Sequence, residues 1–202
     1  MAKEFNVLIT GVGGQGAILM SELLGEAAVK DDFNVRGSEA LGMAVRGGSV
    51  VSTIRIGSEI YGPLIPMGKC HLLIGIEPAE ALRNISYLSP SSLIILNLRG
   101  IVPFTVSQGK SNYPTQDEIL EKLNRASRQV IRLDAACLAE EAGNPITANM
   151  VMLGAAFGGG QMPVKLETIK AVIQSHFPAK LAPVNIKAFD LGYQACQQAV
   201  KN

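Results

Sequence analysis

The amino-acid sequence predicts an α/β fold: a Rossmann-like sandwich around a mainly parallel sheet, with a helical C-terminal third. Three observations lead to this prediction. Short apolar runs alternate with stretches of helical periodicity through the first two thirds of the chain, as in repeated β–α units. A glycine-rich loop joins the first apolar run to the first periodic stretch. The patterns that follow residue 143 are all helical.

The predicted strands are short apolar runs bounded by glycine or polar residues, which is typical of buried strands. The third run alternates in polarity, and Gly57-Ser58-Glu59 behind it has the composition of a turn between antiparallel strands. The predicted strands cover residues 5–10, 33–39, 49–56, 71–76, 92–98 and 128–134.

The predicted helices follow from apolar spacings of three and four residues and from capping residues. Pro78 suits the first turn of a helix, and Thr115 with Glu118 forms a capping box. Gly143 is placed to end another helix. The predicted helices cover residues 15–30, 77–88, 119–126, 135–142, 150–157, 166–177 and 185–200.

The chain shows no internal repeat, low-complexity tract or linker, apart from a loop near residues 99–114 that contains Pro and Gly. We therefore expect a single domain over residues 1–202. Hydrophobic residues make up 48% of the chain and charged residues 17%, below the roughly 25% charged of an average soluble domain. Such a surface is typical of a chain that is partly covered by another subunit.

Composition also disfavours several classes of partner. The net charge of +1 gives no electrostatic footprint for nucleic acid. The longest apolar runs are strand-sized, far below the roughly 18 residues that span a bilayer. The N-terminus lacks the pattern of a signal peptide. We therefore expect a cytoplasmic protein without nucleic-acid or membrane partners.

The cysteines and histidines predict neither a metal site nor a catalytic residue. Cys70, Cys137 and Cys196 are far apart and form no C-x-x-C, so no iron–sulfur or zinc site is expected. Neither His71 nor His176 lies near a Ser or Cys motif, so no hydrolytic triad is predicted.

A glycine cluster, GVGGQG, separates the first predicted strand from the first predicted helix. Its spacing fits the G-x-G-x-x-G pattern of dinucleotide-binding units. Glycines let backbone N–H groups approach a phosphate, and a helix N-terminus adds partial positive charge. The candidate anion-binding residues are Gly11, Gly13, Gly14, Gln15 and Gly16.

Three interpretations of this cluster remain open. A dinucleotide site also needs an acidic residue about 20 residues further on, at the end of the second strand. Glu39 stands near that place, whereas Arg36 would favour a 2′-phosphate. A phosphate ligand other than a dinucleotide would not require that acidic residue, only the glycine loop. In the third interpretation the glycines only allow a tight turn and close packing of the helix on the sheet.

A second cluster, Arg46-Gly47-Gly48-Ser49, lies just before the third predicted strand. A guanidinium can bind a phosphate or carboxylate bidentately, and adjacent glycines let the backbone come close. If the first and third strands are neighbours, this cluster lies beside the glycine loop at the sheet edge where α/β proteins bind ligands. Alternatively, Arg46 pairs with Glu39 or a carbonyl group and only holds the loop.

The sequence resembles the gamma-type subunits of 2-oxoacid:ferredoxin oxidoreductases over nearly its whole length. The resemblance rests on GVGGQG and SEALGMAVRGGSVVSTIRIG, and it extends through GNPITANMVMLGAA and NIKAFDLG. The second motif is similar to the indolepyruvate branch, although Leu41 and Val45 stand where that branch often has His and Gln. Gamma subunits of pyruvate or 2-oxoglutarate enzymes are therefore the near alternative.

The resemblance implies a subunit of an enzyme that decarboxylates a 2-oxoacid on thiamine diphosphate, reduces ferredoxin through iron–sulfur clusters and forms an acyl-coenzyme A. This chain has no G-D-G motif with a thiamine-type Asn pair and no cysteine cluster, so we expect it to be inactive alone. A large partner subunit would carry thiamine diphosphate, Mg and the clusters, and would link the chain to ferredoxin. Coenzyme A would be the co-substrate.

Two expectations about surfaces follow. The glycine loop and Arg46 are predicted to bind a phosphate of coenzyme A, and the low-charge segment 38–49 is predicted to be buried against the partner. A hypothesis from another class is a freestanding dinucleotide-binding protein. A weaker one is an assembly protein with a vestigial pocket.

Overall fold

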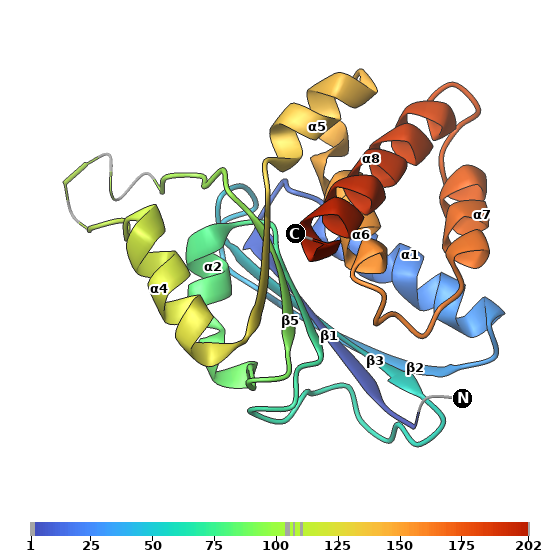
Figure 1. Ribbon diagram of the computed structural model, residues 1–202, viewed down its shortest axis with the longest axis horizontal. Coiled ribbons are helices and arrows are strands. Elements are labelled where there is room, and N and C mark those ends of the chain that lie inside the picture. The colour runs from blue at the N-terminus through green and yellow to red at the C-terminus, as the bar shows by residue number, and fades with distance from the viewer. Residues whose placement is uncertain (1–2, 104–105, 107, 110, 202) are drawn as a thin grey trace.

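The computed structural model describes residues 3–103, 106, 108–109 and 111–201, and it has a six-stranded sheet between two layers of helices (Figure 1). The strand order is β2-β3-β1-β4-β5-β6. The strands are β1 (Phe5–Val12), β2 (Asn34–Leu41), β3 (Ser49–Gly57), β4 (Leu72–Gly75), β5 (Leu93–Asn97) and β6 (Gln129–Leu133).

One layer of helices contains α2 and α4, and the opposite layer contains α1, α6, α7 and α8 (Figure 1). Helix α5 packs on α8 and α6. The helices are α1 (Ala17–Lys30), α2 (Pro78–Arg83), α4 (Gln116–Ala126), α5 (Ala135–Ala142), α6 (Ala148–Gly158), α7 (Leu166–His176) and α8 (Ala182–Lys201). Short 3₁₀ segments cover Ile85–Tyr87 and Pro145–Thr147. The α/β class and the helical last third are confirmed.

The sheet is mainly parallel because every strand except β3 runs in the same direction. Strand β3 is antiparallel to both of its neighbours, β2 and β1. The β2–β3 hairpin turns at residues 42–48, where the Gly42 N–H donates to the Ser49 carbonyl at 2.7 Å. The predicted antiparallel turn at residues 57–59 is wrong, since the chain there leaves β3 for β4, on the far side of β1.

The caps predicted from the sequence are present. Thr115 and Glu118 form a reciprocal capping box at α4, and Pro78 lies at the start of α2. Gly143 ends α5 in the left-handed region with φ of 113°. Each cap satisfies backbone groups that a helix end leaves unpaired, which stabilises these boundaries.

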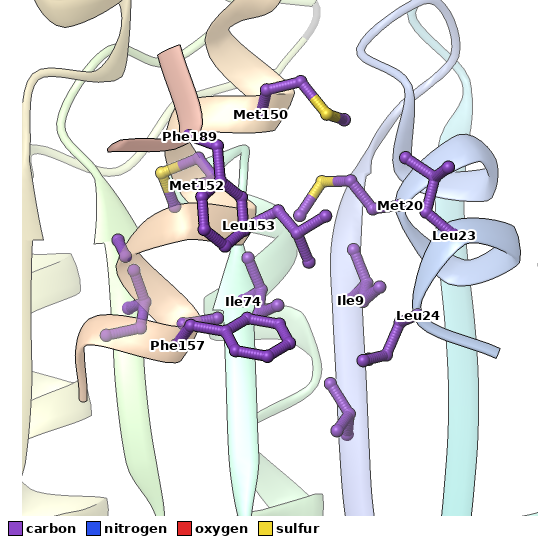
Figure 2. Close-up of a cluster of buried hydrophobic side chains, with 14 of the residues drawn as sticks. Ile9, Met20, Leu23, Leu24, Ile74, Met150, Met152, Leu153, Phe157 and Phe189 are labelled. Atoms are coloured by element: carbon purple, nitrogen blue, oxygen red, sulfur yellow. The ribbon is translucent and has the colours of Figure 1, made fainter. Parts of the chain in front are cut away.

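The two-residue period of the strands divides the apolar core into two parts. Val7 and Ile9 of β1 pack with α1 and α6, whereas Leu8 packs in a second cluster with residues of α2 and α4. Figure 2 shows the first part, in which Ile9 and Leu153 lie among side chains from both helices. Burying each such aliphatic side chain contributes roughly 1.5–3 kcal/mol.

Helices α6 and α8 approach each other closely because glycines face backbone at their crossing. A Cβ at Gly154 would overlap the carbonyl group of Phe189, and one at Gly192 would overlap that of Val151. Residues 149–157 of α6 are all buried, so this helix is covered on every side. The crossing therefore determines how the helical third sits on the sheet.

We expect Gly154→Ala to lower the free energy of unfolding by about 1–3 kcal/mol, since the added methyl group must displace the α8 backbone. Gly25→Ala on α1 is the matched control, because its Cβ would meet only Val35 at 3.9 Å. That change should be neutral or stabilising by up to about 1 kcal/mol. Denaturant titration of both variants measures the difference. Equal stability of the two variants would contradict this packing argument.

Candidate functional site

The glycine loop is a tight turn between β1 and α1. The Val12 N–H donates to Gln15 Oε1 at 2.8 Å, and the Gln15 N–H donates to the Val12 carbonyl at 3.1 Å. Gly14 and Gly16 have φ values of 97° and 80°, in the left-handed region that favours glycine. The turn is thus held by Gln15 and by two residues that need positive φ.

The antiparallel pairing of β1 with β3 brings the two predicted clusters together. Val12 lies opposite Ser49 in the ladder. The Gly13 N–H donates to the Gly48 carbonyl at 2.8 Å, and the Gly47 N–H donates to the Gly13 carbonyl at 3.1 Å. Both backbone groups of Gly13 are therefore occupied by protein.

Two of the glycines also have a packing role. A Cβ at Gly13 would overlap the carbonyl of Val45, and one at Gly16 would overlap the side chain of Asn149. Gly14 differs, since a Cβ there would meet nothing within 4 Å. Gly11 lies within β1, where a Cβ would come 2.9 Å from Gln15 Oε1. Packing thus explains the glycines at 11, 13 and 16, and Gly14 faces open space.

The N-terminus of α1 keeps unpaired donors. Its N-cap residue is Gly16, which has no side-chain cap, and its first turn contains no acidic residue. Within the described part of the chain, the N–H groups of Gly14, Gly16 and Ala17 meet no acceptor. The partial positive charge at this end of the helix is therefore not neutralised by a cap or by an acidic residue of the first turn.

Arg46 is exposed, and its guanidinium makes no hydrogen bond or ion pair with any described residue. The alternative Arg46–Glu39 pair is therefore not formed. Glu39 is exposed on β2, opposite Ser52. Because β3 separates β2 from β1, Glu39 is not on the strand beside the glycine loop, as a dinucleotide-binding unit requires.

Arg46 and the glycine turn open into different hollows. Arg46, Gly47 and Ser49 line a hollow of about 510 Å³. Gly13, Gly14 and Gly16 line a second hollow of about 480 Å³, whose other walls include apolar side chains at residues 41–45. Ala44 lines both, so the segment that carries Arg46 separates the two hollows.

Two buried carboxylates form the floor of the Arg46 hollow at the start of α2. Glu77 is 1% exposed and Glu80 is 4% exposed. Ser49 Oγ donates to Glu80 Oε2 at 2.6 Å, and Arg83 pairs with Glu80 Oε1 at 2.6 Å. Glu77 accepts the Glu80 N–H at 2.8 Å and the hydroxyl of Tyr113. Every carboxylate oxygen therefore has a protein donor.

Burial, together with the hydrogen bond to Glu77, raises the pKa of Tyr113, so its phenol stays protonated as a donor. The sequence alone does not reveal this cluster of Glu77, Glu80 and Tyr113. Glu77 before Pro78 is a recognisable N-cap signal, but its contact with Tyr113 depends on the tertiary fold.

The described residues contain no group of three or more His, Cys, Asp or Glu side chains that could hold a metal ion. Cys70 lies before β4, Cys137 on α5 and Cys196 on α8. Burial raises the pKa of Cys70 to about 12 and that of Cys196 to about 11, so both remain thiols. The three cysteines lie far apart and belong to no such group, so the described residues do not offer the several neighbouring thiolates that ligate an iron–sulfur cluster. Among the helices described here, none has both the length and the apolar character to cross a membrane.

Comparison with known proteins shows which family the chain belongs to. The family model described as pyruvate ferredoxin/flavodoxin oxidoreductase matches residues 6–195. Indolepyruvate oxidoreductase subunit IorB of Pyrococcus horikoshii is 43% identical over 197 residues, which is 97% of this chain and 98% of that protein. The pyruvate/ketoisovalerate oxidoreductases common subunit gamma of Pyrococcus abyssi is 27% identical over 93% of this chain and 94% of its own.

A solved structure shows the same fold within a longer chain. It is the 2-oxoglutarate:ferredoxin oxidoreductase from Magnetococcus marinus with 2-oxoglutarate, coenzyme A and succinyl-CoA bound, with a TM-score of 0.75 and 18% identity. The match covers 98% of this chain and 32% of that one. The resemblance to gamma-type subunits is confirmed. The chain belongs to the pyruvate ferredoxin/flavodoxin oxidoreductase family, as a small subunit of a multi-subunit oxoacid oxidoreductase.

Proposed function

We propose that this chain is the cofactor-free subunit of an indolepyruvate:ferredoxin oxidoreductase, which converts an aryl pyruvate to its acyl-coenzyme A and reduces ferredoxin. The observation that carries the proposal is the 43% identity to an indolepyruvate oxidoreductase subunit over nearly both full lengths, against 27% for the pyruvate/ketoisovalerate subunit. Pyruvate or 2-oxoglutarate as substrate is the second candidate, supported by the shared family model and fold.

In this proposal a large partner subunit holds thiamine diphosphate with Mg and the iron–sulfur clusters. When bound there, these groups supply the decarboxylation chemistry and the electron path to ferredoxin. The dispersed, partly buried cysteines of this chain support that division, because they offer no cluster site. This chain would contribute surface, backbone donors and Arg46.

The predicted partner surface is the end of β2 and the loop behind it. Leu41, Met43 and Val45 are all exposed, although they are apolar. They adjoin the glycine turn, since Leu41 and Val45 line its hollow. Exposed apolar side chains gathered at one place are typical of an interface core. We infer that segment 38–49 contacts the large subunit.

The predicted ligand of the glycine turn and Arg46 is a phosphate of coenzyme A. Gly14, Gly16 and the α1 N-terminus offer N–H donors, and Arg46 a guanidinium, that pair with no described residue. The supporting residues are Gly47, Gly48 and Ser49, which hold the Arg46 loop against Gly13 and Glu80. Because the two groups face adjoining hollows, a ligand that reaches both must extend across the end of β1.

Co-expression with the large subunit should yield a complex that turns over indolepyruvate with ferredoxin and coenzyme A, and faster than pyruvate or 2-oxoglutarate. The isolated chain should show no turnover. The measurement is the rate of ferredoxin reduction with each 2-oxoacid, for the complex and for each subunit. Activity of the isolated chain would refute the proposal, and preference for pyruvate would favour the second candidate.

Met43→Asp should abolish co-purification with the large subunit, because a buried unpaired charge opposes association. Met67→Asp is the matched control, since Met67 is also exposed but lies on the loop between β3 and β4. Affinity capture of the partner followed by size-exclusion chromatography measures both. Intact complex with Met43→Asp would show that this surface has been misplaced.

Arg46→Ala should raise the KM for coenzyme A by roughly ten- to a hundredfold, as expected for loss of a charged hydrogen bond. Decarboxylation that does not require coenzyme A should remain nearly unchanged. Arg36→Ala provides a control, since Arg36 is also exposed and, among the described residues, its side chain bonds to the Val35 carbonyl alone. A parallel fall in decarboxylation with an unchanged KM for coenzyme A would place Arg46 in the interface instead.

A further inference from the structure

A third hollow, of about 290 Å³, lies where β1, β4 and β5 end. Gly14 and Gln15 line it from the glycine turn, and Asn97 and Arg99 line it from the end of β5. Helices α1 and α2, which follow β1 and β4, lie on opposite faces of the sheet (Figure 1). Open α/β sheets bind ligands at the crevice where successive connections diverge in this way.

Three helices direct their N-terminal ends toward this hollow. Gly14 and Gln15 precede α1, Ala136 lies in the first turn of α5, and Ala148 and Asn149 open α6. The first turns of these helices contain no acidic residue. The Asp134 carboxylate caps α5 by accepting the Cys137 N–H, and Asn149 accepts the Met150 N–H of α6, whereas the N-terminus of α1 has no side-chain cap, so its partial positive charge stays open.

A buried amide in the wall of the hollow has an unused donor. Asn149 is 7% exposed, and its Oδ1 accepts the Met150 N–H at 2.9 Å. Its Nδ2 lies against Gly16 and donates to no acceptor in the described ranges. Gln15 is similar, because its Oε1 is taken by the Val12 N–H and its Nε2 has no such acceptor either. Asn149 is buried and Gln15 half-buried, and both residues line the hollow, so each leaves an amide donor available to an acceptor there.

Arg99 supplies a positive charge to this hollow. Its Nε pairs with Asp134 at 2.9 Å, while its two terminal nitrogens make no hydrogen bond with a described residue. Asn97 fixes the backbone at this point, since its Nδ2 donates to the carbonyls of Arg99 and Ile76, both at 3.0 Å. Asn97 Oδ1 also accepts the Ala135 N–H at 3.2 Å. Asn97 therefore ties the backbone at Arg99 to Ile76, which follows β4, and to Ala135, which begins α5.

The hollow differs in charge from the one that contains Arg46. No carboxylate is among its described lining residues, whereas Glu77 and Glu80 line the Arg46 hollow. Donors from Arg99, Gln15 and Asn149 line a space beside the N-terminus of α1, which has no side-chain cap. Such a set recognises a compact oxyanion and disfavours a cation or an apolar group.

We propose that Arg99, Gln15, Asn149 and the N-terminus of α1 form a binding site for a compact oxyanion, distinct from the Arg46 hollow. The inference rests on the proposed function for its ligand. The oxyanions of that reaction are the phosphates of coenzyme A and the carboxylate of the 2-oxoacid. Arg99 is then a substrate-binding residue of the complex.

The test compares Arg99→Gln with Asp134→Asn in the co-expressed complex. Both changes remove the Arg99–Asp134 ion pair, but only the first removes the cation, and Asn can still cap α5. Arg99→Gln should raise the KM for one substrate by about ten- to a hundredfold, and Asp134→Asn should change it less than about twofold. Titration of the full chain with inorganic pyrophosphate should show the same contrast in Kd.

The substrate that responds identifies the source of the oxyanion. An effect on coenzyme A but not on its 3′-dephospho form indicates the 3′-phosphate, and an equal effect on both indicates the pyrophosphate. An effect on the 2-oxoacid indicates its carboxylate. The inference is overturned if no KM and no pyrophosphate Kd changes, or if Asp134→Asn reproduces the effect of Arg99→Gln.

These outcomes are separable from those of the Arg46 proposal. If Arg46→Ala raises the KM for coenzyme A while Arg99→Gln changes no KM or Kd, the Arg99 site alone is overturned. The reverse result overturns the Arg46 site and supports this one. The pyrophosphate titration does not depend on which 2-oxoacid the complex prefers.

Discussion

The antiparallel ladder between β1 and β3 places Ser49 opposite Val12, so the chain must return to the end of β1 before β3 begins. The returning segment then lies against the glycine turn and is held there by two backbone hydrogen bonds to Gly13. Without this pairing, the position of the Arg46 cluster relative to the glycine turn would not be fixed. The division of the region into separate hollows is a further result of the same contact.

The glycines of the turn combine packing with exposure of backbone donors. Gly13 and Gly16 lie where another group presses against them, and Gly14 faces open space. The close approach at Gly13 occupies its own N–H and carbonyl, but the N–H groups of Gly14, Gly16 and Ala17 pair with none of the described residues. Close packing at Gly13 and open donors at Gly14 and Ala17 therefore coexist in one loop, and Gly16 takes part in both.

Local signals in the sequence predicted most of the secondary structure. Each of the six predicted strands is present within a few residues, and the Thr115–Glu118 capping box and the Gly143 cap are formed as predicted. The predicted loop near 99–114 includes residues 104–105, 107 and 110, which lie outside the described residues. Capping and strand patterns depend on neighbours in sequence, which explains this agreement.

Strand order and the walls of the hollows could not be predicted in this way. The insertion of β3 between β2 and β1 depends on pairing between distant segments, and it removes Glu39 from the neighbourhood of the glycine turn. The same holds for the hydrogen bond from Tyr113 to Glu77, 36 residues apart in sequence, and for Arg99 and Gln15, which line the same hollow. Resemblance to a family identified the chain, but it did not reveal which polar side chains share a hollow.

Strand β2 ends the sheet, so the N–H and C=O groups along its outer side have no strand to pair with. Its last residue, Leu41, and the loop behind it add exposed apolar side chains at the same border. An open strand edge of this kind is a template for pairing with further copies and for aggregation. The isolated chain is therefore expected to self-associate along this border more readily than a chain whose sheet edges are covered.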